Sequence, residues 1–517
     1  MNTDRTAKPR LLLVGLDAAE PSLIERWTEE GALPNLARLR RNGCYGRLAT
    51  VAPYLTGSPW PTFYTGTSPG AHGHYHVLQW NPRRGAMERP FGDWLPLTPF
   101  WRAFAAAGPR PIVLDMPLAY PPRPFEGIEI SGWAAHDVLG PPASHPPEAL
   151  SLFRGGFGRR VMRTEVYGPQ KTIPLLDLPP RLSGATEQLA RMGASLMRRE
   201  TWDLFFVGFG AAHRAGHKLW DETSAAGSVK PGTREIFRSA FRGVYAALDE
   251  AIGVLVEAAG SGTTVLVFSL HGMGPNNSRE ILFPEMLRRV LHRSRVSAAG
   301  PPPRSRLVRL RDAVPIELRR AVKSRFPLPI QDRLTAFWRR SSAVWEAAEA
   351  FTLPADQHGY VRINLKGRER DGVVSEESYE SLRDAIAEGV RTFRDARSGE
   401  PIVADVVRPD RALPAGDRAG LLPDLVVIWS ETPAAGHEAV ASDRFGTIPW
   451  PTPGRNPDGR SGNHRGEGFL LAAGEGIPRG DRIESGTILD LAPTICARLG
   501  APSPFPMEGK PLRPIAG

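Results

Sequence analysis

Side chains that can bind a metal ion stand beside four short apolar runs of the sequence. The set comprises one carboxylate and four imidazoles: Asp17, His213, His217, His271 and His464. A lone histidine is more often a hydrogen-bonded structural residue than a ligand. His213 and His217, however, are four positions apart and can share one face of a helical turn. Taken together, the five side chains predict a zinc-like site, because imidazole and carboxylate are the ligands that such metals prefer.

The apolar runs predict the elements that must position these groups. Six runs have the length and composition of buried strands: residues 10–17, 111–116, 203–209, 263–269, 424–429 and 468–473. Helical patterns lie between several of them, at 22–43, 182–200 and 378–396. Strands that alternate with helices predict an α/β fold with a mostly parallel sheet covered on both faces. Because ligands bind at the carboxyl ends of strands in such sheets, the metal-binding side chains are expected to meet at one edge.

A hydroxyl-rich stretch, TGSPWPTFYTGTSPGAHGHYH (Thr56–His76), follows another predicted strand. Its three prolines and four glycines exclude a long helix or a central strand. A structural turn does not need so many serines and threonines. Beside a metal site, the stretch indicates a hydroxyl nucleophile activated by metal coordination, with most of the other residues serving as scaffold.

These motifs resemble the alkaline phosphatase superfamily, specifically its type I phosphodiesterase/nucleotide pyrophosphatase branch. The resemblance runs from VGLDAAEP through TGSPWPTFYTGTSPGAHG, AHRAGHKLWD and SLHGMGP to GNHRGEGFLLAAG and LDLAPTICARLGAPSPFPMEGKPL. It rests on the order and spacing of the motifs and covers nearly the whole chain. The resemblance implies a three-layer αβα sandwich with a mostly parallel central sheet. It also implies a metal-dependent hydrolase or phosphoryl transferase that acts on phosphoesters, foremost phosphodiesters, through a covalent threonine intermediate.

The resemblance also implies a role for each matching residue. Asp17 matches a metal ligand, and Thr56 matches the nucleophile, which is also a ligand. His217 and His464 match ligands of one ion, and His271 matches a ligand of the other.

Two positions depart from the family pattern, because His213 and Leu270 stand where carboxylates are expected. Leucine cannot coordinate a metal, so little negative charge remains to offset two closely spaced cations. We therefore expect one tightly bound divalent ion, held by His213, His217 and His464, with zinc as the expected metal and iron or manganese as alternatives.

A second ion is expected to bind only loosely, with Asp17, Thr56 and His271 as its ligands. The negative charge of a substrate would then replace the missing carboxylates.

The net charge of +10 is concentrated in one segment of the 517-residue chain. Residues 288–340 hold fifteen Arg or Lys and three acidic residues, so the rest of the chain carries a small negative excess. We predict an inserted basic cap or lid at 285–354, between residues 1–284 and 355–517 of the catalytic domain. Residues 313–326 alternate apolar and basic side chains as an amphipathic helix does, and could recruit an anionic substrate or lie on an anionic membrane surface. A solvated basic face packed on the core is the alternative.

The amino-acid composition limits which cellular compartment and which binding partners we expect for the protein. Two cysteines, Cys44 and Cys496, allow neither a disulfide framework nor a thiolate metal cluster. The apolar run near the N-terminus is too short for a secretory signal, and no stretch reaches the length of a membrane span. We expect a cytoplasmic protein that does not bind nucleic acid, because its basic charge belongs to one segment.

Three functions remain open from the sequence. The first is a hydrolase of phosphoesters, whose substrate would be an anionic small molecule or a lipid or glycan head group. The second is a sulfate-ester hydrolase. The third is a non-catalytic binding or regulatory protein that keeps the fold. The retained histidines favour an enzyme, whereas Leu270 favours the non-catalytic alternative.

Overall fold

The structure, a computed structural model, describes residues 9–90, 94–106, 108–134, 141–151, 170–225, 231–294 and 348–516. Its largest element is a nine-stranded sheet. In spatial order, the strands are β20 (Gly486–Thr487), β2 (Gly43–Ala49), β19 (Glu467–Ala473), β9 (Thr263–Ser269), β1 (Arg10–Leu16), β8 (Leu204–Phe209), β5 (Pro111–Leu114), β6 (Ile128–Ser131) and β7 (Ala143–His145). Only β19 and β7 run against the other strands of this sheet. The predicted α/β fold with a mostly parallel sheet is confirmed.

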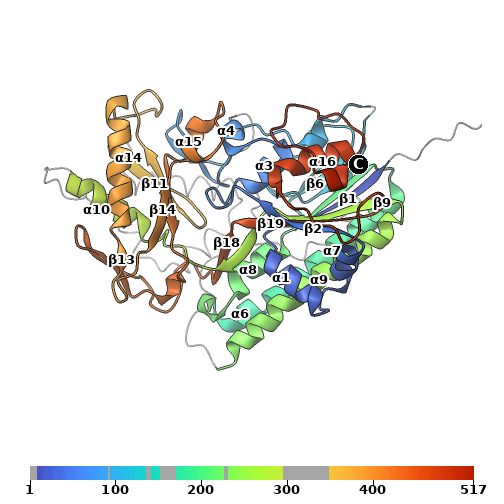
Figure 1. The fold of residues 1–517 in the computed structure, drawn as a ribbon, viewed down its shortest axis with the longest axis horizontal. Helices are drawn as coiled ribbons and strands as arrows, with labels where there is room; N and C mark the ends of the chain where they lie inside the picture. The colour runs from blue at the N-terminus through green and yellow to red at the C-terminus, as the bar shows by residue number, and fades with distance from the viewer. Residues whose placement is uncertain are drawn as a thin grey trace, which may run out of the picture.

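Helices cover both faces of this sheet, which gives three layers (Figure 1). Strand β1 shows why the central strands are apolar throughout: Leu12 and Val14 face one helical layer, whereas Leu11 and Leu13 face the other. The first layer contains α1 (Pro21–Glu29), α2 (Pro34–Arg41), α7 (Leu178–Arg199) and α9 (Thr233–Ala259). The second contains α3 (Pro59–Thr65), α16 (Leu491–Arg498) and α17 (Arg513–Ala516).

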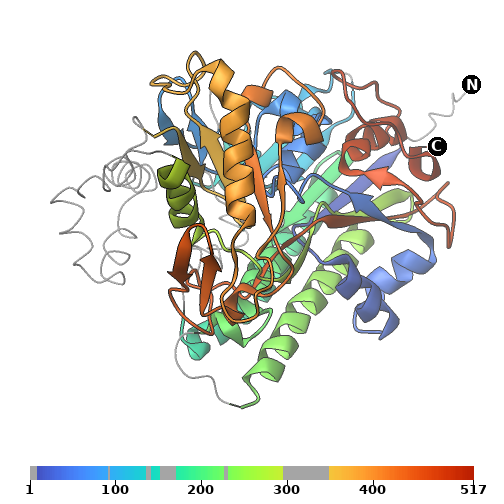
Figure 2. The ribbon, with the colours of Figure 1, turned by 60° about the vertical axis from the view of Figure 1, so that its left-hand side comes forward.

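A smaller antiparallel sheet lies beside the large one (Figure 1). Its order is β11 (Ala350–Leu353), β12 (Gly359–Ile363), β15 (Leu425–Trp429) and β14 (Val403–Val407). Val361 and Val427 on one face pack against α10 (Phe283–Ser294) and α14 (Glu376–Arg391), which Figure 2 shows alongside this sheet. Tyr360 and Val426 on the opposite face pack with Leu55, next to the hydroxyl-rich stretch. The smaller sheet therefore contributes to the surroundings of Thr56.

The structure places one predicted strand differently from what the alternating strand–helix pattern suggested. Of the predicted strand at 424–429, Leu425–Trp429 form β15 of the smaller, antiparallel sheet rather than a strand of the central one. The run is apolar throughout because both faces of β15 are covered, so its composition does not distinguish the two sheets.

The predicted basic cap at 285–354 falls mostly on residues 295–347, outside the described residues, as does the amphipathic pattern at 313–326. Its described ends are α10 and β11, and both belong to the apolar core of the smaller sheet. The cap and its boundaries stay a prediction. Within the described ranges, no helix has both the length and the apolar character needed to cross a bilayer.

Candidate metal centre and nucleophile

The topology of the large sheet brings four chain segments to one edge. Strands β1, β8 and β9 are parallel, so the residues that follow them meet where these strands end. Strand β19 runs the opposite way, so the residues that precede it lie at the same edge. Asp17 thus follows β1, and α8 (Ala211–Leu219) follows β8. His271 follows β9, and His464 lies in β18 (Gly462–Arg465), which pairs with β10 (Gly272–Pro275).

His213 and His217 lie one turn apart on α8, and both are buried. Their Nε2 atoms are 3.0 Å apart. The Nδ1 atom of His213 lies 2.6 Å from the Asp17 carboxylate, and Nδ1 of His217 lies 2.9 Å from the Gly462 carbonyl oxygen.

These contacts determine which nitrogen of each ring carries hydrogen. A carbonyl and an ionised carboxylate can only accept, so the Nδ1 atoms of both rings must donate. In a neutral imidazole the other nitrogen then carries a lone pair. The Nε2 lone pairs of His213 and His217 therefore face each other across 3.0 Å, an arrangement that requires a cation between them or a proton on one ring.

His464 completes a set of three imidazoles with these two. Its ring centroid lies 4.8 Å from that of His213 and 5.1 Å from that of His217. One ligand atom from each of the three rings lies within 4.8 Å of the others, and in the described part of the chain this is the one such group of His, Cys, Asp or Glu. Burial holds the pKa of His464 well below its ordinary value, and the neighbouring His271 and His213 lower it further. The ring is therefore neutral, which is the form that binds metal.

His271 lies against this group but is not a member of it. Its Nδ1 is 3.3 Å from Nδ1 of His464, and its Nε2 is 3.6 Å from Oδ1 of Asp17. Leu270, the residue before it, is fully buried in the apolar cluster that includes Trp60 and Phe268. The position that should carry a carboxylate is thus part of the hydrophobic core.

Asp17 is buried, and its carboxylate accepts hydrogen bonds from two N–H groups on different elements. Its Oδ1 accepts from Nε1 of Trp60 at 2.8 Å, and its Oδ2 accepts from Nδ1 of His213. Burial alone would raise the pKa of Asp17, but its interactions with His213 and His271 outweigh burial and hold the pKa well below its usual value. Ala18, the next residue, has a φ of 54°, a left-handed conformation that is unusual for alanine. The backbone turns at this point, and the Ala19 N–H donates to the Leu16 carbonyl at 3.2 Å.

Thr56 lies between β2 and α3 and is 5 % exposed. Its Oγ1 has no hydrogen-bond partner among the described residues, while its backbone N–H donates to the Tyr360 hydroxyl at 3.3 Å. Gly57 fits here because a Cβ would lie 2.4 Å from the Tyr75 carbonyl oxygen. The backbone is therefore held on both sides of Thr56, and the hydroxyl of this threonine makes no hydrogen bond within the described structure.

Residues that the sequence interpretation did not single out also contribute to this edge. Trp60 donates a hydrogen bond to the Asp17 carboxylate, and the Tyr360 hydroxyl accepts one from the backbone N–H of Thr56. The loop between β11 and β12 carries Asp356, whose carboxylate lies 3.5 Å from Nε2 of His76 and 3.3 Å from the guanidinium of Arg460. An aspartate and a histidine two residues apart after a strand, in the DQH of this loop, were a signal that could have revealed it. No comparable signal marks Tyr360.

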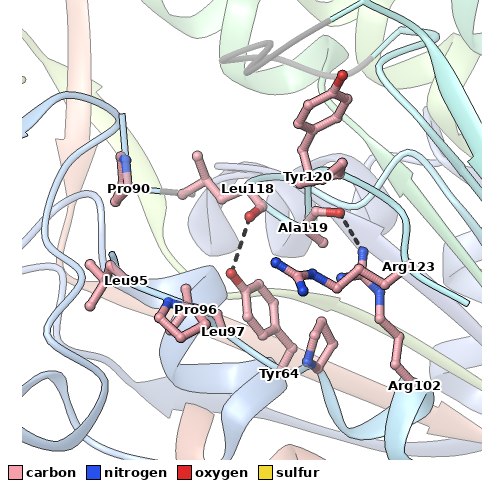
Figure 3. A pocket seen from close by; sticks show the side chains of 12 residues that line it. Tyr64, Pro90, Leu95, Pro96, Leu97, Arg102, Leu118, Ala119, Tyr120 and Arg123 are labelled. Carbon is pink, nitrogen blue, oxygen red and sulfur yellow. Dashed lines mark hydrogen bonds between the residues drawn. The ribbon is translucent and has the colours of Figure 1, made fainter. Parts of the chain in front are cut away.

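A separate pocket beside α3 does not belong to this centre (Figure 3). It encloses about 20 Å³ and is lined by Tyr64, Arg102, Leu118 and several prolines. The Tyr64 hydroxyl donates to the Leu118 carbonyl at 3.3 Å, and Arg102 donates to the Ala119 carbonyl at 2.7 Å. A cavity of this volume holds about one water molecule, so it offers no room for a substrate.

Comparison with known proteins identifies the family of the chain. The family model described as type I phosphodiesterase / nucleotide pyrophosphatase matches residues 11–432, and His464 lies beyond the matched range. No curated protein matches the chain. Human ectonucleotide pyrophosphatase/phosphodiesterase 5 is a similar solved structure, with 11 % identity, coverage of 97 % of this chain and 97 % of that chain, and a TM-score of 0.50. An inactive variant of the murine protein in complex with AMP has 13 % identity, coverage of 97 % and 98 %, and a TM-score of 0.48.

At these identities the human structure supports the fold alone, which is the α/β architecture with a large, mostly parallel sheet. The match of the family model to most of the sequence confirms the resemblance drawn from its motifs. The chain belongs to the type I phosphodiesterase/nucleotide pyrophosphatase family.

Proposed function

We propose that this protein is a metal-dependent hydrolase of phosphoesters, foremost phosphodiesters, with Thr56 as its nucleophile. The observation that carries the proposal is the approach of the Nε2 atoms of His213 and His217 to 3.0 Å, with His464 beside them. Both lone pairs are directed at one point, and a cation at that point would turn their repulsion into attraction.

The donor set fits a zinc-like ion. Two imidazole nitrogens bound tetrahedrally to zinc stand about 3.3 Å apart, close to the separation of these Nε2 atoms. A three-imidazole set leaves a fourth position open for substrate, as catalytic zinc sites do. When bound, the ion would act as a Lewis acid toward a phosphoryl oxygen and would lower the pKa of a coordinated hydroxyl. Iron and manganese are the alternative metals.

The chain's own residues then supply the rest of the reaction. The uncommitted Oγ of Thr56 forms a bond to phosphorus as the bond from phosphorus to the leaving oxygen breaks, and the threonine proton passes to that oxygen. Water then attacks the same phosphorus, returns a proton to Thr56 and releases the phosphate product. Tyr360 holds the backbone of Thr56 during both steps.

A turnover assay tests this proposal. The metal-free protein is supplied with Zn²⁺, Mn²⁺ or Fe²⁺ and given chromogenic phosphodiesters, phosphomonoesters and sulfate esters. Metal-dependent release from a phosphodiester, abolished by a chelator, is the expected result. Release from the sulfate ester alone would make the protein a sulfatase. If no metal gives turnover on any ester, the non-catalytic alternative replaces the proposal.

A further inference from the structure

We propose that Asp17 is a positioning residue for the metal-binding histidine His213, rather than a ligand of the tightly held ion. The inference rests on the proposed function, because it concerns the same centre. It differs from the role that the resemblance implies for Asp17, which is that of a ligand and which we expect only at the second, loosely bound ion.

The argument starts from the partners of the carboxylate. Asp17 is 3 % exposed, and each of its oxygens accepts one N–H. Trp60 on α3 supplies one at 2.8 Å, and His213 on α8 supplies the other at 2.6 Å. Both hydrogen bonds are buried and charge-assisted, which makes them shorter and stronger than neutral ones. The carboxylate therefore joins the helix that follows Thr56 to the helix that carries His213 and His217.

The hydrogen bond from Nδ1 of His213 to Asp17 determines which nitrogen of the ring can bind a metal ion. It places the hydrogen on Nδ1, leaves the lone pair on Nε2 and fixes the plane of the ring. Nε2 is the atom that faces His217 at 3.0 Å. A carboxylate that holds the far nitrogen of a metal-binding imidazole in this way raises the basicity of the ligand, and removing it commonly weakens metal binding by about 10- to 100-fold.

A substitution that keeps the size of the side chain isolates this role. Asp17→Asn leaves one oxygen and one NH₂ group, so it can accept from Trp60 or from His213 but not from both. Whichever N–H loses its acceptor then faces the NH₂ donor. In Asp17→Asn we expect metal affinity to fall by about 10- to 100-fold. Affinity is measured as the apparent Kd for Zn²⁺ or Co²⁺ in competition with a chromogenic chelator, without reference to activity.

A second variant separates positioning from general damage. Trp60→Phe removes the competing donor and should change the metal Kd by no more than about threefold. In the double variant Asp17→Asn/Trp60→Phe, the amide oxygen is free to turn toward His213, and metal affinity should recover by about tenfold relative to Asp17→Asn alone. Thermal unfolding of the metal-free forms is measured in parallel to establish that all three variants fold.

The outcomes distinguish this inference from the function on which it rests. If wild-type protein binds no ion, the proposed function fails. If wild-type protein binds one ion and Asp17→Asn binds it equally well, Asp17 does not position His213, and the proposed function stands. If Asp17→Asn loses only a second, weaker equivalent, Asp17 is a ligand of that ion and the inference is overturned.

Discussion

At the scale of single residues, Thr56 differs from the other serines and threonines of its loop in having no partner for its hydroxyl among the described residues. Ser58 donates to the His74 carbonyl, and Thr62 contacts Nε2 of His72. The remaining hydroxyls are also paired: Thr65 with Pro61 and Thr67, and Ser68 with Glu508. The sequence predicted that one hydroxyl reacts and that most of the others are scaffold. The other hydroxyls are indeed paired, and the reaction at Thr56 stays a prediction.

The first prediction compares Thr56 with Thr65. Thr56→Ala should abolish turnover of the best phosphodiester and leave the melting temperature nearly unchanged, because its hydroxyl makes no bond in the described structure. Thr65→Ala removes a hydroxyl that donates to the Pro61 carbonyl at 2.7 Å, so it should cost about 1 kcal/mol of stability and keep most of the turnover. Normal turnover by purified Thr56→Ala would disprove the nucleophile assignment.

At the scale of elements, the smaller sheet supports the loop that carries Thr56. Tyr360 of β12 accepts from the Thr56 N–H, and its ring lies 5.9 Å from that of Tyr75. Tyr75 provides a matched control, because it is equally buried and its hydroxyl accepts from the Trp80 N–H instead. Both Tyr→Phe variants should lose about 1–2 kcal/mol of stability, whereas only Tyr360→Phe should lower kcat, by about tenfold. An equal fall in kcat for the two variants would show that Tyr360 has no specific role at Thr56.

A second element-scale prediction concerns the connection between β10 and α10. Burial and, to a smaller extent, the nearby Asp356 raise the pKa of Glu280 from the ordinary 4.5 to about 7. The folded state therefore binds more protons than the unfolded state between these two pH values, so the free energy of unfolding falls as the pH rises through that window, by up to about 3 kcal/mol.

Glu280→Gln removes this ionisation while keeping an oxygen that can accept from the Ala355 N–H. In metal-free protein, the variant should melt above the wild type at pH 8 and near it at pH 5. Glu235→Gln, at a glutamate whose side chain is 74 % exposed, serves as the control. The same shift at both pH values would show that ionisation of Glu280 does not limit stability.

At the scale of the whole molecule, the sequence predicted much of the scaffold but little of its long-range contacts. The six apolar runs are all strands, because burial on both faces leaves a continuous hydrophobic pattern. That pattern could not assign β15 to the smaller sheet. The convergence of His213, His217 and His464 was predictable, since strand ends meet at one edge of a sheet. The contacts of Trp60 with Asp17 and of Tyr360 with Thr56 were not, because they join residues 43 and 304 positions apart.

The central claim is that one divalent ion is held by three imidazoles in each chain. The most direct test is elemental analysis of purified protein after extensive dialysis, with His217→Ala and His464→Ala analysed in parallel. The account predicts about one retained equivalent in the wild type and loss of that equivalent in both variants, because each variant removes one of three ligands. Two equivalents retained by the wild type, or no retained metal at any concentration supplied beforehand, would contradict it.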